Sequence, residues 1–310
     1  MAAEVGLAAR AHVNPAPELQ PSPRTPPNSG CRLARVAARQ KLGSMFVLRL
    51  RAPGWPGGAP GQFALLRHEA SARFLPRAFS LHAQDGELVS FLIAPVGPGT
   101  EELAEAGVGE GVHVLGPLGH GFDLTEILAG TPRRLVVVGG GVGVAPFRLL
   151  LDRLTTHAAA TLPEVVVLFG FRDDVQAECL AAFEPAVDRL RARGAAVELE
   201  TICEDGSLGR AGLVTTLLQE VGLSAGDAIL ACGAHAMCQA VWDLGLAAGG
   251  VRAWFSLEAG MACGVGSCHG CVIRLADGSL AKVCRRGPVF GAGEVFGESR
   301  HPCAVPGGDR

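Results

Sequence analysis

Two patterns of apolar and polar positions divide the chain. From residue 31 to about residue 130, short apolar or alternating runs such as QFALLR and VHVLGPLG are separated by Gly/Pro turns, which is typical of an antiparallel barrel. From Leu135 onward, apolar runs alternate with glycine turns and helical segments, as in LVVVGGG followed by PFRLLLDRLTTH. This second pattern predicts a parallel sheet covered by helices on both faces.

The two patterns leave a segment at each end of the chain. Before the barrel, six prolines between Pro15 and Pro27 predict a disordered tail. After about Trp254 both patterns stop, and a cysteine- and glycine-rich segment follows. We therefore predict a multidomain protein of the β and α/β classes: a tail at 1–30, an antiparallel barrel at 31–130, a parallel-sheet α/β domain at 131–254 and a small cysteine module at 255–310.

Charge and composition narrow the partners and the compartment. The 310 residues carry a net charge of −3 without a Lys/Arg-rich run, so we expect neither nucleic acid nor a membrane as partner. The longest apolar run is interrupted by four glycines, a proline and Arg148, so no membrane span is expected. The N-terminus does not read as a secretory signal, which favours a cytoplasmic location. In a reducing cytosol, the clustering among the ten cysteines indicates metal binding rather than disulfides.

A glycine-rich turn separates the first strand of the predicted α/β domain from its helix. In VVVGGGVGVAPF, Pro146 falls in the first helical turn, and glycines let the backbone approach a pyrophosphate at the helix N-terminus. The turn departs from the G-x-G-x-x-G fingerprint because it ends in proline, and a turn without a ligand is the alternative. The candidate nucleotide-binding residues are Gly139, Gly140, Gly141 and Gly143.

The choice between NAD and NADP is open at this level. FGFRDD, at the end of the second predicted strand, places Arg172 beside Asp173 and Asp174. An arginine there favours a 2′-phosphate, whereas the aspartates disfavour one.

Two features of the predicted barrel indicate a redox cofactor when they are taken together. LPRAFSLH places Arg77 and Ser80 on one strand; an arginine pairs with a pyrophosphate, and a hydroxyl hydrogen-bonds a ring nitrogen. GPGT at 97–100 then opens a helix, which again offers a phosphate cradle. Taken separately, these are a surface arginine and a capped helix start.

Four cysteines near the C-terminus have the spacing Cys-x4-Cys-x2-Cys-x12-Cys, the ligand order of plant-type [2Fe–2S] proteins. The intervening glycines let the loop wrap a cluster and direct backbone N–H groups at its sulfurs. Zinc is the alternative, although structural zinc more often uses two C-x2-C knuckles. A Rieske centre needs two histidine ligands in place of two cysteines. The predicted ligands are Cys263, Cys268, Cys271 and Cys284.

RAFS, GPGT, GPLGHGF, GGGVGVAPF and ACGAHAM resemble motifs of the ferredoxin-reductase superfamily, in which an FAD-binding barrel precedes an NAD(P)-binding α/β domain. The chain departs from the usual motifs in three places: Ala78 and Ala234 stand where proline is common, and the strand before GPGT reads Leu92-Ile93-Ala94 where an aromatic and a basic residue are common. The resemblance implies that the arginine strand and the strand before GPGT hold the flavin, that GPGT contacts its phosphates, and that the CG motif lies beside the nicotinamide. The residues implied are Arg77, Ala78, Phe79, Ser80, Leu92, Ile93, Ala94, Gly99, Thr100, Cys232 and Gly233.

FSLEAGMACGVGSCHGCVIRL, VCRRGPVFGAGEV and CEDGSLGRAGLVTTLL narrow the resemblance to the electron transfer subunits of dihydroorotate dehydrogenase B, from about Cys31 to Val295. This resemblance implies that a separate FMN-containing catalytic subunit oxidises dihydroorotate, in pyrimidine (UMP) biosynthesis. Electrons then pass through the [2Fe–2S] cluster and FAD to NAD. It also implies a heterotetramer with two copies of each chain.

Three other functions are open on the sequence. The chain also resembles the small subunit of bifurcating or sulfhydrogenase-type complexes, but some of those carry aspartate in place of the first loop cysteine, so Cys263 favours the dihydroorotate branch. A stand-alone NAD(P)H reductase that feeds an oxygenase or ferredoxin is a second alternative. A zinc-containing nucleotide-binding scaffold is the alternative that is not an enzyme.

Overall fold

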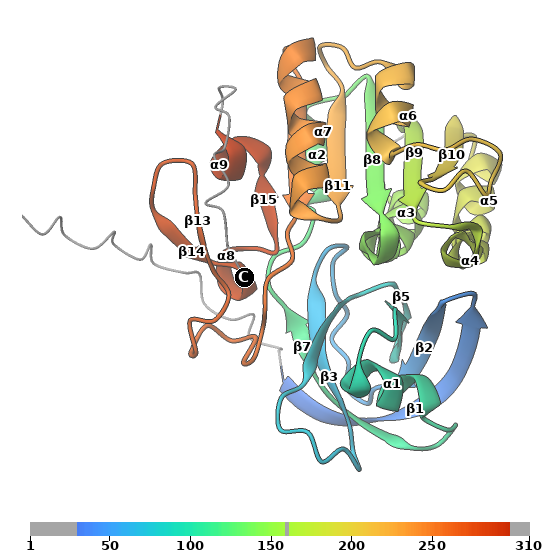
Figure 1. Ribbon diagram of the computed structural model, residues 1–310, viewed down its shortest axis with the longest axis vertical. Helices are drawn as coiled ribbons and strands as arrows, with labels where there is room; N and C mark the ends of the chain where they lie inside the picture. Colours follow the sequence, from blue (N-terminus) through green and yellow to red (C-terminus); the bar gives the residue numbers. More distant parts are fainter. Residues whose placement is uncertain (1–29, 159–160, 298–310) are drawn as a thin grey trace, which may run out of the picture.

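The computed structural model describes residues 30–158 and 161–297. The predicted N-terminal tail lies outside the described residues except for Gly30, which begins the first strand. The chain forms a lower antiparallel layer and an upper α/β layer, with the C-terminal segment alongside both (Figure 1).

The predicted antiparallel barrel is a curved seven-stranded sheet with the order β4-β3-β7-β1-β2-β6-β5. Its helix α1 (Pro98–Glu105) begins at the predicted GPGT segment. Leu48, Phe91 and Ile93 are fully buried in its core. The strands are β1 (Gly30–Leu42), β2 (Met45–Arg51), β3 (Phe63–His68), β4 (Arg77–Ser80), β5 (Ala83–Asp85), β6 (Leu88–Ile93) and β7 (Gly111–Leu118).

The α/β layer is a six-stranded sheet with the order β10-β9-β8-β11-β12-β15. Five of its strands are parallel, as the alternating pattern predicts. They are β8 (Arg134–Gly140), β9 (Glu164–Phe171), β10 (Val197–Cys203), β11 (Ala228–Cys232) and β12 (Arg252–Ser256).

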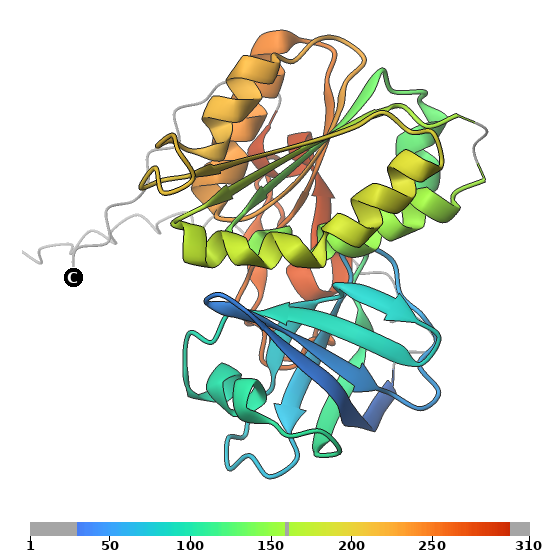
Figure 2. The same ribbon diagram turned by 90° about the vertical axis from the view of Figure 1, so that its right-hand side faces the viewer.

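Helices cover both faces of this sheet (Figure 2). Helices α3 and α5 pack with Leu135 and Val137 of β8, whereas α6 and α7 pack with Val136 and Val138. This division follows from the alternation of side chains along a strand. The elements are α2 (Leu124–Ala129), η1 (Gly141–Val144), α3 (Ala145–Thr156), α4 (Asp174–Ala177), η2 (Glu178–Ala182), α5 (Glu184–Ala192), α6 (Val214–Val221) and α7 (His235–Ala248).

The C-terminal segment joins both layers. Its strand β15 (Val289–Gly291) pairs antiparallel with β12, so the sheet is mixed rather than purely parallel. Its cysteine loop lies against the barrel: a Cβ on Gly264 would stand 2.9 Å from side-chain atoms of both Leu65 and Leu118. The remaining elements are β13 (Val272–Arg274), β14 (Leu280–Lys282), α8 (Val283–Arg286) and α9 (Ala292–Phe296). Across residues 30–158 and 161–297, no helix combines the length and the apolar character that a membrane crossing requires.

Candidate functional site

An interdomain cleft of about 370 Å³ opens between the barrel and the α/β domain. Strand β4 and the end of β6 form one wall, and the η1 turn with the end of β11 forms the other. The cleft therefore collects residues that lie far apart in the sequence, from Phe63 to Pro288. The predicted site residues that line it are Arg77, Ala78, Phe79, Ser80, Leu92, Ala94, Thr100, Gly143 and Cys232.

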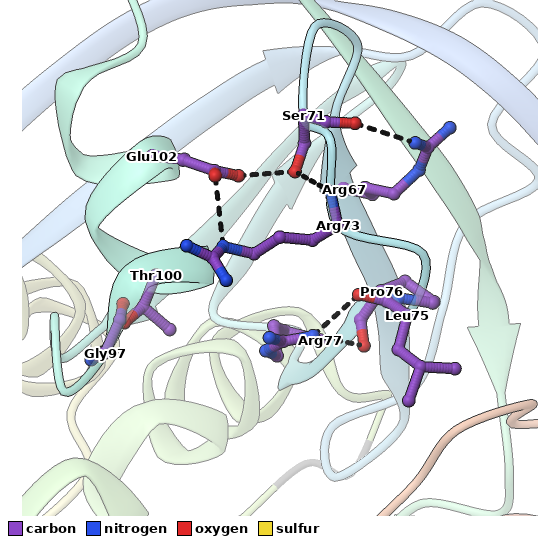
Figure 3. Close-up of polar contacts among 9 residues, drawn as sticks. All are labelled: Arg67, Ser71, Arg73, Leu75, Pro76, Arg77, Gly97, Thr100 and Glu102. Carbon is purple, nitrogen blue, oxygen red and sulfur yellow. Dashed lines mark hydrogen bonds and ion pairs between the residues drawn. The ribbon is translucent and has the colours of Figure 1, made fainter.

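At one end of this cleft a cation lies beside the start of helix α1 (Figure 3). The Arg77 guanidinium is 3.0 Å from the point where a Cβ on Gly99 would stand. Its Nη1 donates to the Leu75 carbonyl at 2.6 Å, and within the described part of the chain no carboxylate forms an ion pair with it. The Thr100 hydroxyl closes the helix start by donating to the Gly97 carbonyl at 2.7 Å. An unneutralised arginine beside a helix N-terminus fits a pyrophosphate.

A second cleft of about 440 Å³ lies on the other side of the η1 turn. Gly140 and Gly141 line it, whereas Gly143 lines the interdomain cleft, so the glycine turn separates the two spaces. Glycine is required for this close packing, because a Cβ on Gly143 would lie 2.5 Å from the carbonyl oxygen of Cys232. Gly141 also has a φ of 55°, which favours glycine.

Four predicted residues line neither cleft. Ile93 points into the barrel core, and Gly139 packs against Phe169. Gly99 lies under Arg77, and a Cβ on Gly233 would stand 2.7 Å from the methyl carbon of Met237. These four residues therefore contact neighbouring side chains of the protein rather than the space of either cleft.

The cleft also contains residues that the sequence reasoning missed. Ser256, Glu258 and Met261 line it from the segment before the cysteine loop. They belong to FSLEAGM, a segment shared with the dihydroorotate dehydrogenase B subunits that just precedes the first cysteine ligands. Cys232 lies beside Ser256 on the neighbouring strand, and burial raises the pKa of its thiol far above the usual range, so this thiol is neutral at the cleft wall.

The four predicted cysteine ligands meet in two pairs. The backbone N–H of Cys268 donates to the Cys263 sulfur at 3.4 Å, and that of Cys284 donates to the Cys271 sulfur at 3.4 Å. Burial opposes ionisation of Cys263, but backbone N–H groups of Cys268 and Val265 outweigh it and lower the pKa to about 7. Burial raises the pKa of Cys284 to about 12.

Four thiols brought together by one loop and helix α8 suit a two-iron group. Structural zinc needs four ligands around one ion, whereas two irons held by four thiolates need two thiolates each. The N–H donors to sulfur are of the kind that tunes a cluster potential.

The remaining cysteines lie apart from this loop. Cys31 is exposed on β1, while Cys179, Cys203 and Cys238 are buried, as small apolar residues are. Cys303 lies outside the described residues.

Comparisons with known proteins identify both modules. Residues 258–296 match the model of the iron–sulfur cluster binding domain of dihydroorotate dehydrogenase B, and residues 137–243 match that of the oxidoreductase NAD-binding domain.

Curated relatives cover most of the chain. The electron transfer subunit of dihydroorotate dehydrogenase B (NAD(+)) from Caldanaerobacter subterraneus subsp. tengcongensis is 33% identical, over 85% of this chain and 97% of its own length. Its counterpart from Geobacillus thermodenitrificans is 37% identical, over 76% and 86%.

Solved structures support the fold. The structure of an NADH-dependent reduced ferredoxin-NADP oxidoreductase matches with a TM-score of 0.69 and 22% identity, covering 84% of this chain and 89% of that one. A ferredoxin NADP+ reductase from Neisseria gonorrhoeae with bound FAD and NADP has a TM-score of 0.58 and 15% identity, over 73% and 99%. The predicted fold class is confirmed, and the two family models agree with the predicted iron–sulfur and NAD sites. The chain belongs to the family of dihydroorotate dehydrogenase B electron transfer subunits.

Proposed function

We propose that the chain carries electrons from a dihydroorotate-oxidising FMN subunit, through a [2Fe–2S] cluster and FAD, to NAD+ in pyrimidine biosynthesis. One observation supports this most strongly: the cysteine loop leaves directly from the interdomain cleft. Met261 lines the cleft, and Cys263 follows two residues later, so their Cα atoms are at most about 7 Å apart. A cluster on this loop lies within short reach of a flavin in the cleft.

The residues of the cleft suit FAD, which when bound supplies the exchange between one-electron and two-electron transfer. Arg77, with the helix start at Gly99 and Thr100, holds the pyrophosphate. The β4 wall carries the Ser80 hydroxyl into the cleft, where it can hydrogen-bond a ring nitrogen. On the opposite wall, Cys232 and the η1 turn receive the nicotinamide.

The dinucleotide that fits the second cleft best is NAD. Arg172 lines this cleft, but its Nε donates to the Asp173 carboxylate at 3.0 Å. Glu204 also lines it and adds a second negative charge. A carboxylate accepts a hydrogen bond from a ribose 2′-hydroxyl and repels a 2′-phosphate.

The balance of the reaction requires a partner subunit. Oxidation of dihydroorotate to orotate releases two electrons and two protons; NAD+ takes both electrons and one proton, and one proton enters solution. We assign dihydroorotate oxidation to an FMN-containing catalytic subunit, which binds this chain near the cysteine loop in a cytoplasmic assembly of two copies of each. The exposed position of Cys268 in the loop supports this placement.

Co-expression with a candidate catalytic subunit tests the proposal. The purified pair should reduce NAD+ when dihydroorotate is added, and each chain alone should not. If the pair forms but does not couple these reactions, while NADH still reduces another acceptor, the assignment is wrong.

A further inference from the structure

The loop that connects β3 to β4 exposes an aromatic side chain beside the phosphate cradle. Phe74 is 91% exposed and its neighbour Leu75 is 47% exposed. Large apolar side chains that cluster on a surface usually mark a binding site. They line an open depression together with Ala72, Arg73, Arg77 and Glu102.

This exposed aromatic is held by a fixed loop. The Ser71 hydroxyl donates to Glu102 of helix α1 at 2.5 Å, and Arg73 Nε donates to the same carboxylate at 3.1 Å (Figure 3). The Arg73 backbone N–H donates to the Ser71 hydroxyl at 3.1 Å. From the other side, Arg77 holds the carbonyl of Leu75. Phe74 therefore stands on a loop that is tied to α1 before it and to β4 after it.

Arg77 connects this depression to the interdomain cleft, because it lines both. The interdomain cleft, Arg77 and the depression thus lie in a row, as the flavin ring, the pyrophosphate and the adenosine do in FAD. With the flavin placed as proposed above, the isoalloxazine ring would occupy the cleft, the pyrophosphate would meet Arg77 and the start of α1, and the adenosine end would continue past Arg77. On that far side, the exposed aromatic surface in the depression is Phe74.

We infer that Phe74 forms the platform on which the adenine ring of FAD stacks, and that the Ser71–Glu102 contact positions it. This inference rests on the proposed placement of the flavin in the interdomain cleft. It predicts a chain that selects FAD over FMN, since FMN lacks the adenosine half.

Flavin affinities of the full chain, after its flavin is removed, test this directly. Wild type should bind FAD more tightly than FMN. Phe74→Ala should weaken FAD about tenfold, which corresponds to about 1.4 kcal/mol, and should leave the FMN affinity unchanged. Phe74→Trp should retain the FAD affinity, because indole stacks as well. Since Phe74 is 91% exposed, its replacement should not disturb folding.

Two further variants separate stacking from a general surface effect. Ser71→Ala removes the loop contact without altering a group in the depression, and it should weaken FAD several-fold with no change for FMN. Val108→Ala truncates an apolar side chain that is 75% exposed elsewhere on the same domain, and both affinities should stay at wild-type values.

Three outcomes would overturn the inference. An unchanged FAD affinity in Phe74→Ala, or an equal loss for FAD and FMN, would remove the adenine contact. A Phe74→Ala variant that binds FAD normally but no longer binds the catalytic subunit would make this loop a protein interface. A wild-type chain that binds neither flavin would overturn the proposed function as well.

Discussion

The Arg77 guanidinium lies directly over Gly99, 3.0 Å from the position that a Cβ would occupy. We expect Gly99→Ala to displace this arginine from the phosphate cradle and to weaken FAD about tenfold, the scale of one charge-assisted hydrogen bond. Calorimetric titration of Gly99→Ala, Arg77→Ala and the double variant measures this. The two effects should be strongly non-additive; additive losses would show that Gly99 acts without Arg77.

His82 joins the barrel to the nucleotide domain. Its ring is 2% exposed, and Nδ1 donates to the Ala145 carbonyl at 2.8 Å, next to the η1 turn. Burial is the main cause that lowers its pKa from 6.5 to about 4, and nearby Arg148 adds to it. The unfolded chain therefore binds a proton at a higher pH than the folded chain.

This difference predicts a pH-dependent stability. As pH falls from about 6.5 to about 4, His82 should remove about 3 kcal/mol from the free energy of unfolding. Urea unfolding across this range should show that loss in wild type and not in His82→Gln, which cannot titrate. Parallel pH profiles for the two proteins would contradict the role given to His82.

Asp227 stabilises the α/β domain at the edge opposite the clefts. Its fully buried carboxylate pairs with Arg134 at 2.7 Å and with Arg133 at 3.0 Å. Asp227→Ala leaves the half-buried Arg134 without its carboxylate partner, so the unfolding free energy should fall by about 3 kcal/mol. Glu220→Ala, which breaks an exposed pair with Arg210, should leave the unfolding free energy almost unchanged, because solvent screens exposed pairs. NADH affinity should be unchanged in both, and a selective loss of NADH binding would place Asp227 in the site.

The Arg172–Asp173 pair predicts how dinucleotide preference can be changed. Asp173→Ala frees the guanidinium, so kcat/KM for NADPH relative to NADH should rise several-fold. Asp188→Ala, with a carboxylate 75% exposed on α5, is the matched control and should leave the ratio unchanged. If Asp173→Ala also leaves it unchanged, Arg172 does not face the ribose.

Local patterns predicted more of this protein than long-range contacts did. The cysteine spacing and the glycine turn are short motifs, and the residues of each lie together in one loop, at Cys263–Cys268 and at Gly140–Gly143. Likewise, alternating apolar residues predict strands because side chains alternate across a sheet.

The missed features depend on pairings across the chain. Strand β15 joins the sheet through β12. A strand of three residues is too short to be predicted from its own sequence pattern. Ile93 was grouped with Leu92 and Ala94, but alternation along β6 turns it into the barrel core. Phe74 belongs to no motif of the sequence, and the role inferred for it depends on the position of Arg77, which lines the same depression.

Anaerobic NADH titration of the isolated chain, followed by visible absorbance and electron paramagnetic resonance, tests whether this chain transfers electrons between NADH, a flavin and an iron–sulfur cluster. We expect two irons per chain, bleaching of the flavin and a signal from a reduced [2Fe–2S] cluster. Cys263→Ser should keep the flavin bleaching and lose the cluster signal, whereas Cys31→Ser, at an exposed cysteine on β1, should match wild type. A chain that contains zinc and no iron, or one whose iron is never reduced while the flavin is, would contradict the account.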